Sequence, residues 1–420
     1  MFWPVYPFDE LKTFVLNALE HNASYYDHKI MGLPATYLDP KMFPADADFL
    51  ENAPFIRSFI ENPNHIGLHT YEKSISSFQG TQKLELDLLR ICAEEIFKAV
   101  PNNYDGYVAS GGTECNIQAV WIYREYYKNV LDAKNDEIIV LFSEDTHYSL
   151  FKVCNILQLN FKLLNVDFNS REIDFEKLDN LLSELKADGV KYFITVLNMG
   201  TTMFGSIDDI DSITHLYKSH NIQFKIHVDA AFGGFIYPFT NPNNVFNFEN
   251  PNVDSISVDG HKMLQAPYGT GIFLIRKGLI DNVLTEEASY IEGLDHTLCG
   301  SRSGANAIAT WMILNMHGSK GLMDHMEQLI IKSDFICKSL SELDVRFFRN
   351  EFMNIVTIPS EDIPMRICEK YTLVPDTHRG QPKWWKIVVM EHVNWQLIDK
   401  FLLDVAQCNK DNLGMSLAYG

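Results

Sequence analysis

The sequence predicts an α/β fold with a mostly parallel sheet, followed by a smaller α+β domain. The chain is long enough for two packed domains, short apolar runs alternate with helical stretches, and this pattern changes toward the C-terminus. With 420 residues, 46% of them hydrophobic, the chain can bury a large core, since domains usually hold about 100–200 residues. We expect an arm over residues 1–54, a large domain over 55–300 and a small domain over 301–420.

The N-terminal part mixes aromatic, proline and acidic residues without a steady period, which is typical of an arm. Within it we expect a short helix near residues 10–18. Farther along, apolar residues recur at helical spacing before a proline stop: Leu84, Leu88, Cys92, Ile96 and Pro101. This spacing predicts a helix that ends before the proline.

Short apolar runs of strand length then alternate with helical stretches. The runs are Ile138–Phe142, Tyr192–Leu197, Phe224–Val228, Ser255–Val258 and Gly271–Ile275. Continuous apolar runs indicate strands buried on both faces, as in a parallel sheet covered by helices. A helix over 306–317 and two strands, at 354–358 and 386–390, predict the smaller domain. In such sheets ligands bind at the carboxyl ends of the strands.

The charge balance argues against two classes of partner. The chain has 55 acidic and 35 basic residues and a net charge of −20. Nucleic-acid binding needs clustered lysine and arginine, and anionic membrane surfaces also attract basic segments. No stretch of about 18 apolar residues occurs, as a membrane span would need. We therefore expect neither nucleic acid nor membrane as a partner.

The cysteines and the N-terminus favour a cytoplasmic location. Seven cysteines are scattered along the chain without a Cys-x-x-Cys pair, so we expect reduced thiols and no metal site. The first residues lack the basic flank and the long apolar stretch of a signal peptide.

A lysine follows one of the predicted strands directly. Lys262 ends the segment Ser257–Lys262, at the edge of the sheet where ligands bind. An amine must be neutral to attack a carbonyl, and removal from water lowers the pKa of a lysine. Lys262 is therefore a candidate nucleophile, although a lone lysine at such a position is more often a solvated loop residue.

A carboxylate ends the preceding strand. Asp229 lies in the segment His227–Gly234, and Ala230 and Ala231 after it leave room for a flat ring. A carboxylate here can pair with the nitrogen of a pyridine ring, because a protonated ring is a better electron sink. The alternative for Asp229 is a helix N-cap.

Two glycines open a helical stretch at Ser110-Gly111-Gly112-Thr113. Glycine and hydroxyl residues at a helix N-terminus offer free N–H groups to a phosphate, although an ordinary turn is the alternative. The spacing of a dinucleotide fingerprint does not follow, which argues against a nicotinamide-dependent dehydrogenase.

Two further side chains complete the constellation. His147 follows the strand at 138–142, and its imidazole could stack on a cofactor ring. Thr202 follows another strand, and its hydroxyl could reach a phenolic oxygen. In chain order the sequence offers a phosphate cradle, an aromatic partner, a hydroxyl, a carboxylate and a lysine, each after a strand. Together they predict a site for pyridoxal 5′-phosphate.

These motifs resemble those of the group II pyridoxal phosphate-dependent amino-acid decarboxylases, in particular the branch of bacterial histidine decarboxylase and plant serine decarboxylase. The similarity runs from about Gly106 to about Gly304 and more weakly to His392. It is carried by the segments 106–116, 145–149, 200–202, 206–210, 227–231, 255–263 and 300–304. The resemblance implies the aspartate-aminotransferase-like fold type I, with a mostly parallel seven-stranded sheet, and a homodimer with shared active sites.

The resemblance also implies roles for single residues. Lys262 would form the Schiff base, Asp229 would pair with the pyridine nitrogen, and His147 would stack on the ring. We expect further contacts with the cofactor at Gly111, Gly112, Thr113, Thr202, Ala231, Asp259, His261 and Ser301. Asp259 stands where many relatives have a small hydroxyl residue, and Ser301 resembles a residue lent by the partner subunit.

The segment 285–291 resembles a mobile loop with a catalytic tyrosine. Tyr290 would protonate the substrate carbon after carbon dioxide leaves, which suits a general acid. The alternative is an aromatic residue on a surface loop.

The substrate is an amino acid whose side chain the sequence defines poorly. Histidine is the first choice by branch, with aromatic, acidic and small hydroxy amino acids left open. The segment 64–71 departs from the histidine decarboxylase pattern, and Lys386 stands where some relatives carry arginine. Candidate substrate contacts are His69, Arg379 and Lys386.

Three alternatives to a decarboxylase stay open. The same core serves aminotransferases and carbon–carbon lyases, such as those that cleave phosphorylated sphingoid bases. Such a lyase would be expected to carry a membrane anchor and a basic pocket, and the sequence shows neither clearly. A binding protein without catalysis would lack the key lysine or aspartate, and Lys262 and Asp229 are both present.

Overall fold

The structure is a computed structural model that describes residues 1–23, 31, 48, 53–56, 64–66, 77–285 and 294–418. Its centre is a seven-stranded sheet in the order β2-β8-β7-β6-β5-β3-β4. The strands are β2 (Tyr104–Ala109), β3 (Ile138–Ser143), β4 (Asn160–Leu164), β5 (Tyr192–Asn198), β6 (Gln223–Asp229), β7 (Ser255–Asp259) and β8 (Gly271–Arg276). Only β8 runs antiparallel to its neighbours in this sheet, so the predicted mostly parallel sheet is confirmed.

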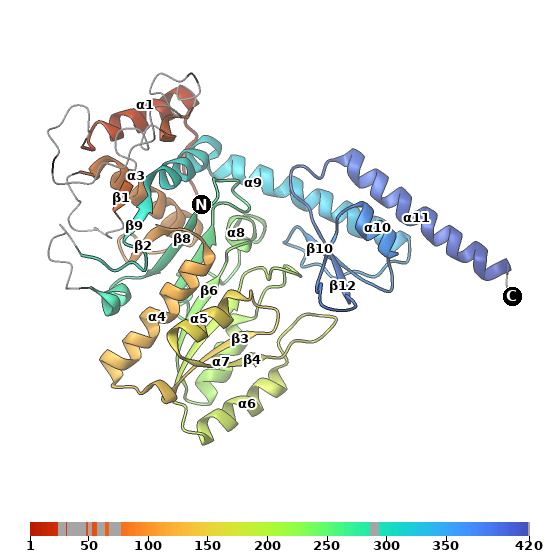
Figure 1. The fold of residues 1–420 in the computed structure, drawn as a ribbon, viewed down its shortest axis with the longest axis horizontal. Coiled ribbons are helices and arrows are strands. Elements are labelled where there is room, and N and C mark those ends of the chain that lie inside the picture. Colours follow the sequence, from red (N-terminus) through yellow and green to blue (C-terminus); the bar gives the residue numbers. More distant parts are fainter. Residues whose placement is uncertain are drawn as a thin grey trace.

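Helices cover both faces of the sheet (Figure 1), which explains the continuous apolar runs. Alternate residues of β3 belong to two separate cores: Ile139 and Leu141 to one, Val140 and Phe142 to the other. One core is closed by α4 (Gly112–Leu131) and α5 (Ser149–Leu157), the other by α6 (Phe175–Ala187) and α7 (Ile210–Ser219). The five predicted strands all occur, each lengthened by one or two residues.

The N-terminal part packs beside the sheet. The predicted helices appear as α1 (Phe8–Leu19) and α3 (Gln79–Arg90), and α3 continues as a π-helical turn over Ile91–Ile96. The indole Nε1 of Trp3 donates to the carbonyl of Leu314 at 2.8 Å and ties the chain start to α9 (Gly304–Glu342). A two-stranded sheet pairs β1 (Asn64–Ile66) with β9 (Ser301–Ser303). Shorter elements are α8 (Tyr237–Thr240) and 3₁₀ turns at Pro54–Ile56, Asn135–Glu137, Gly233–Phe235 and Leu279–Val283.

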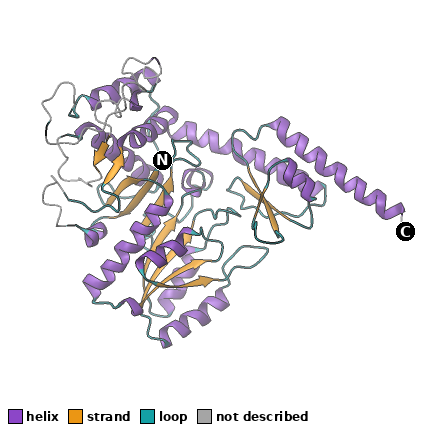
Figure 2. Cartoon of the chain, viewed as in Figure 1, coloured by secondary structure: helices purple, strands orange, loops and turns teal. Residues whose placement is uncertain are grey.

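The long helix α9 (Gly304–Glu342) connects the sheet to the C-terminal part (Figure 2). It is interrupted at Gly318, whose φ of 63° leaves the helical range, so the predicted helix at 306–317 is its first segment. Beyond it, a three-stranded antiparallel sheet contains β10 (Ile355–Pro359), β12 (Trp384–Val388) and β11 (Val374–Pro375). Together with α10 (Met365–Lys370) and α11 (Trp395–Ala418), this sheet surrounds a core of its own. The predicted domain boundaries stay a prediction.

The parallel strands bring five loops to one edge of the sheet. The carboxyl ends of β2, β3, β5, β6 and β7 lie there, and each leads into a segment singled out in the sequence. Within the described ranges, no helix is long and apolar enough to cross a membrane. No cluster of three or more metal-ligating side chains occurs in the same ranges.

Candidate active site

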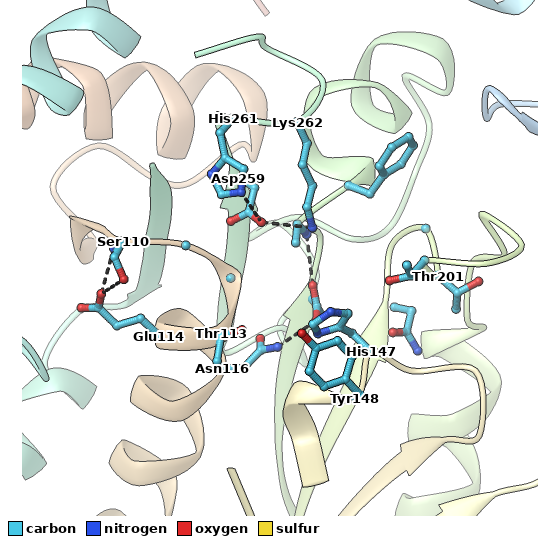
Figure 3. A pocket seen from close by; sticks show the side chains of 18 of the residues that line it. Ser110, Thr113, Glu114, Asn116, His147, Tyr148, Thr201, Asp259, His261 and Lys262 are labelled. Carbon is cyan, nitrogen blue, oxygen red and sulfur yellow. Dashed lines mark hydrogen bonds and ion pairs between the residues drawn. The ribbon is translucent and has the colours of Figure 1, made fainter. Parts of the chain in front are cut away.

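A cleft of about 560 Å³ opens at the carboxyl ends of these strands. Figure 3 shows the side chain of Lys262 extending into it beside Asp259, toward His147. The predicted residues that line the cleft are Gly111, Gly112, Thr113, His147, Thr202, Asp229, Ala231, Asp259, His261 and Lys262. The fold therefore gathers segments that are up to about 150 residues apart in the sequence, because parallel strands end at the same edge.

Three other predicted residues of the described ranges do not line this cleft, and two lie outside those ranges. Ser301 lies in β9, and Arg379 is exposed on the loop between β11 and β12. Lys386, on β12, reaches the cleft's edge without being part of its wall. His69 and Tyr290 lie outside the described residues.

The glycine pair forms a close-fitting cradle at the start of α4. Gly111, with φ of 153°, precedes the helix, and Gly112 is its first residue. A Cβ atom at Gly112 would lie 3.1 Å from the Cβ of Ala231 and 3.3 Å from an oxygen of Asp259. The backbone at Gly112 is therefore accessible from the cleft only because glycine has no side chain. The free N–H groups of the first helical turn suit an anion such as phosphate.

Lys262 is paired with a buried carboxylate. Its Nζ lies 3.1 Å from Oδ2 of Asp259, which is 3% exposed. Burial raises the pKa of Asp259, although the charges of Lys262 and His261 act in the opposite direction. The other oxygen, Oδ1, is buried without a hydrogen-bond partner among the described residues. This acceptor faces the cradle, since a Cβ at Gly112 would lie 3.4 Å from it.

Asp229 is held by two donors at the end of β6. Its Oδ2 accepts from Nδ2 of Asn116 at 2.9 Å, and its Oδ1 accepts from the backbone N–H of Ala231 at 3.1 Å. The carboxylate is 7% exposed and lines the cleft. This arrangement suits a carboxylate that must face a ring nitrogen.

His147 is half-buried at the N-terminus of α5. Its Nδ1 lies 2.9 Å from Oγ of Ser149, and the backbone N–H of Ser149 also points at Nδ1, at 3.3 Å. Burial lowers the pKa of His147, and the positive end of a helix dipole also disfavours the charged imidazole. Its ring is therefore suited to stacking as a neutral group.

Sequence reasoning gave no role to several residues of the cleft. Asn116, Tyr148, Phe232 and Tyr268 line it. The signal for Asn116 was present: it is a polar residue four positions after Gly112, on the helix face that otherwise carries buried apolar residues. The three aromatic residues gave no signal, because they stand at loop positions without a period.

The residues present fit pyridoxal phosphate. The cradle at Gly111 and Gly112 can hold its phosphate, Asp229 faces the cleft as a partner for its ring nitrogen, and Lys262 supplies the amine. Individual residue roles stay predictions.

Comparisons with known proteins agree with this geometry. Residues 85–353 match the model of the pyridoxal-dependent decarboxylase conserved domain. The chain is 46% identical to a tryptophan decarboxylase of Clostridium sporogenes over 98% of its own length and 99% of that protein. It is 30% identical to a histidine decarboxylase of Vibrio anguillarum over 67% of this chain and 70% of that one.

Solved structures show the same fold. An L-methionine decarboxylase from Streptomyces sp. 590 superposes with a TM-score of 0.69 and 20% identity, covering 95% of this chain and 93% of that chain. This similarity supports the aspartate-aminotransferase-like fold type I.

The chain belongs to the pyridoxal-dependent decarboxylase family. It is an amino-acid decarboxylase, and its cofactor is pyridoxal phosphate. The family decides against the aminotransferase, the carbon–carbon lyase and the silent binding protein, all of which the sequence alone left open.

Proposed function

We propose that this enzyme decarboxylates an aromatic L-amino acid, with L-tryptophan as the preferred substrate. The main support is the relative named a tryptophan decarboxylase, which matches 98% of this chain at 46% identity. Histidine, the first choice from the sequence, is not confirmed, because the histidine decarboxylase relatives are 28–30% identical.

The composition of the cleft supports an aromatic side chain. Tyr148, Phe232 and Tyr268 lie in its wall and offer flat apolar surface. Of its carboxylates, Glu114 and Asp229 already accept from Ser110 and Asn116, and Asp259 pairs with Lys262 through Oδ2. The large ring of an indole gains more from stacking and edge contacts with such aromatic walls than a smaller imidazole does.

The residues divide the work as follows. When bound, pyridoxal phosphate supplies the electron sink for the bond to the departing carboxylate. Lys262 holds the cofactor, Asp229 keeps a proton at the ring nitrogen, and His147 packs on the ring. Tyr290, outside the described residues, is proposed to return a proton to the substrate carbon. The protein selects the bond that breaks by orienting it.

Lys386 is proposed to bind the substrate carboxylate. Its Nζ donates to the carbonyl of Thr202, a residue of the cleft wall, at 2.9 Å. Burial and the charge of Lys262 lower the pKa of Lys386. An anion arriving between the two lysines would stabilise both charges.

The test is carbon dioxide release from single L-amino acids by the purified holoenzyme. The panel contains tryptophan, tyrosine, phenylalanine, histidine, methionine, glutamate and serine, with Lys262→Ala as the blank. We expect kcat/KM to be highest for tryptophan and at least about tenfold lower for histidine, a difference of about 1.4 kcal/mol. A highest value for histidine would return the assignment to the choice made from sequence.

We also propose a homodimer with shared active sites and a cytoplasmic location. Ser301 is exposed and lies outside the cleft of its own chain, as expected of a residue that serves a partner. All seven cysteines are free, as expected in a reducing compartment. Sedimentation of the holoenzyme tests the first proposal, and fractionation of the source cells tests the second.

A further inference from the structure

A continuous hydrogen-bonded chain runs behind the cleft and joins Asp229 to His147. Its central residue is Asn116, which is 1% exposed on the first turns of α4. The amide nitrogen of Asn116 lies 2.9 Å from Oδ2 of Asp229 and 3.1 Å from Oγ of Ser149. Its amide oxygen lies 2.9 Å from Nε2 of His227. Two segments, β6 and the start of α5 after β3, therefore meet at one amide of α4.

The chemistry of these groups allows one orientation of the amide. A carboxylate can only accept hydrogen bonds, so the side of Asn116 that faces Asp229 must be the nitrogen. The oxygen then faces His227 and accepts from an N–H at its Nε2. Reversing the amide would set an oxygen against the carboxylate of Asp229 in a buried site, at a large cost.

His227 continues the hydrogen-bonded chain deeper into the protein. Burial lowers its pKa to about 4, so the ring is neutral and Nδ1 must accept. Nδ1 lies 2.7 Å from Oγ of Ser255, whose oxygen is also in contact with the hydroxyl of Tyr123. The three side chains are completely buried, and each donates toward the next, from Tyr123 to Ser255 to His227 to Asn116.

The same assignment continues toward the cleft. Ser149 accepts from Asn116, so its own hydroxyl proton is free to point at Nδ1 of His147, 2.9 Å away. The backbone N–H of Ser149 points at the same nitrogen. With two donors directed at it, Nδ1 is an acceptor, and a neutral imidazole then carries its proton on Nε2. Nε2 has no partner among the described residues.

We propose that Asn116, through Ser149, is a positioning residue that fixes the proton of His147 on Nε2 and so presents an N–H donor to the cleft. The same amide holds Asp229, so the two groups that flank the cofactor ring are set by one side chain. Neither Asn116 nor Ser149 needs to touch the substrate for this role.

The experiment reads the tautomer of His147 directly. Protein labelled with ¹⁵N-histidine is studied by long-range ¹H–¹⁵N correlation, first without and then with cofactor, and His147→Gln identifies the signal. We expect Nε2 to be protonated and Nδ1 to be bare in the wild type. Because the cofactor-free protein is measured, the result does not depend on catalysis.

Three variants of Ser149 and Asn116 test the chain. Ser149→Ala removes one donor to Nδ1 and should lower the ratio of the Nε2–H to the Nδ1–H tautomer about fivefold, the size expected for one hydrogen bond. Ser149→Thr keeps the hydroxyl and should restore the wild-type ratio. Asn116→Leu, which keeps the shape of the side chain, should disturb the ratio and weaken cofactor binding as well.

Ser333→Ala is the matched control. Ser333 is equally buried, but its hydroxyl donates to the carbonyl of Leu329 within α9, so its loss should leave the His147 signals unchanged. A wild-type ring protonated on Nδ1 would overturn the proposal. So would unchanged His147 signals in a folded Ser149→Ala protein.

Discussion

The ammonium of Lys386 donates to the backbone carbonyl of Thr202 across 2.9 Å, and this bond joins β12 to the loop after β5. The two residues are 184 positions apart. The bond brings a cation of the C-terminal part to the cleft that contains Lys262, and the charge of Lys262 contributes to the lowered pKa of Lys386. The contact is the basis for the proposed role of Lys386 in carboxylate binding.

Replacing Lys386 should weaken substrate binding. Lys386→Met is expected to raise KM by about 10- to 100-fold, because a hydrogen bond to a charged group is worth about 1.5–3 kcal/mol. Lys386→Arg should keep most of the affinity, because the charge remains. Steady-state kinetics give the values, with Lys383→Met, an exposed lysine next to the same strand, as control. An unchanged KM in Lys386→Met would exclude the role.

The cradle predicts a defect in cofactor binding for Gly112→Ala. The added Cβ would lie 3.1 Å from the Cβ of Ala231 and close to Asp259, so a neighbour or the phosphate must shift. We expect the Kd for pyridoxal phosphate to rise about tenfold or more, equal to at least about 1.4 kcal/mol. Fluorescence titration of the cofactor-free protein measures this. Gly321→Ala adds a Cβ at an ordinary distance of 3.4 Å from His317 and should bind like the wild type.

His227 predicts a specific dependence of stability on pH. Burial lowers its folded pKa to about 4, whereas the unfolded value is about 6.5. Between these values the unfolded chain binds a proton that the folded chain does not, so stability falls as the pH falls through this window. Above about pH 6.5 both states are neutral and the contribution is constant.

His227→Gln isolates this contribution. Between pH 7 and pH 5 the wild type should lose about 2 kcal/mol more of its free energy of unfolding than the variant, because about 1.5 pH units lie below the unfolded pKa. Urea unfolding at the two pH values gives both differences. Equal losses in the two proteins would mean that His227 is protonated in the folded state.

Mixing two inactive variants tests the shared active site. Lys262→Ala lacks the lysine, and Ser301→Asp places a negative charge where the partner's phosphate is proposed to lie. After subunit exchange, half of the dimers are hybrids with one complete site each, so about a quarter of the wild-type activity should return. Activity that never exceeds the average of the two separate variants would argue that each chain forms its site alone.

The sheet was readable from sequence where its strands are buried on both faces. β3, β5 and β8 are nearly continuous apolar runs. β6 and β7, where apolar residues alternate with polar ones, were also predicted. β4 was missed because it is an edge strand whose first four residues are exposed. β2 was missed because Asp105 and Gly106 interrupt its apolar pattern. Glycine at position 106 has a structural reason: a Cβ there would lie 2.3 Å from the carbonyl oxygen of Phe273 on the neighbouring strand β8.

The separate motifs of the site could be predicted from the sequence, because each follows a strand of the same sheet. The hydrogen bonds that connect these motifs could not be predicted, since they join residues far apart in the chain. Asn116 and His227 are 111 positions apart, and their hydrogen bond depends on how α4 lies on the sheet. The contact of Lys386 likewise depends on where the C-terminal part packs. The substrate preference depends on such contacts, which explains why histidine was chosen from motifs alone.

The central claim is that Lys262 holds the cofactor of this decarboxylase. Borohydride reduction of the holoenzyme, followed by proteolysis and mass spectrometry of the peptides, tests it most directly. We expect the pyridoxyl group on the peptide that contains Lys262, and a Lys262→Ala protein with neither this adduct nor the visible absorption band of the bound cofactor. An adduct on another lysine of the wild type, or none after pyridoxal phosphate is supplied, would contradict the account.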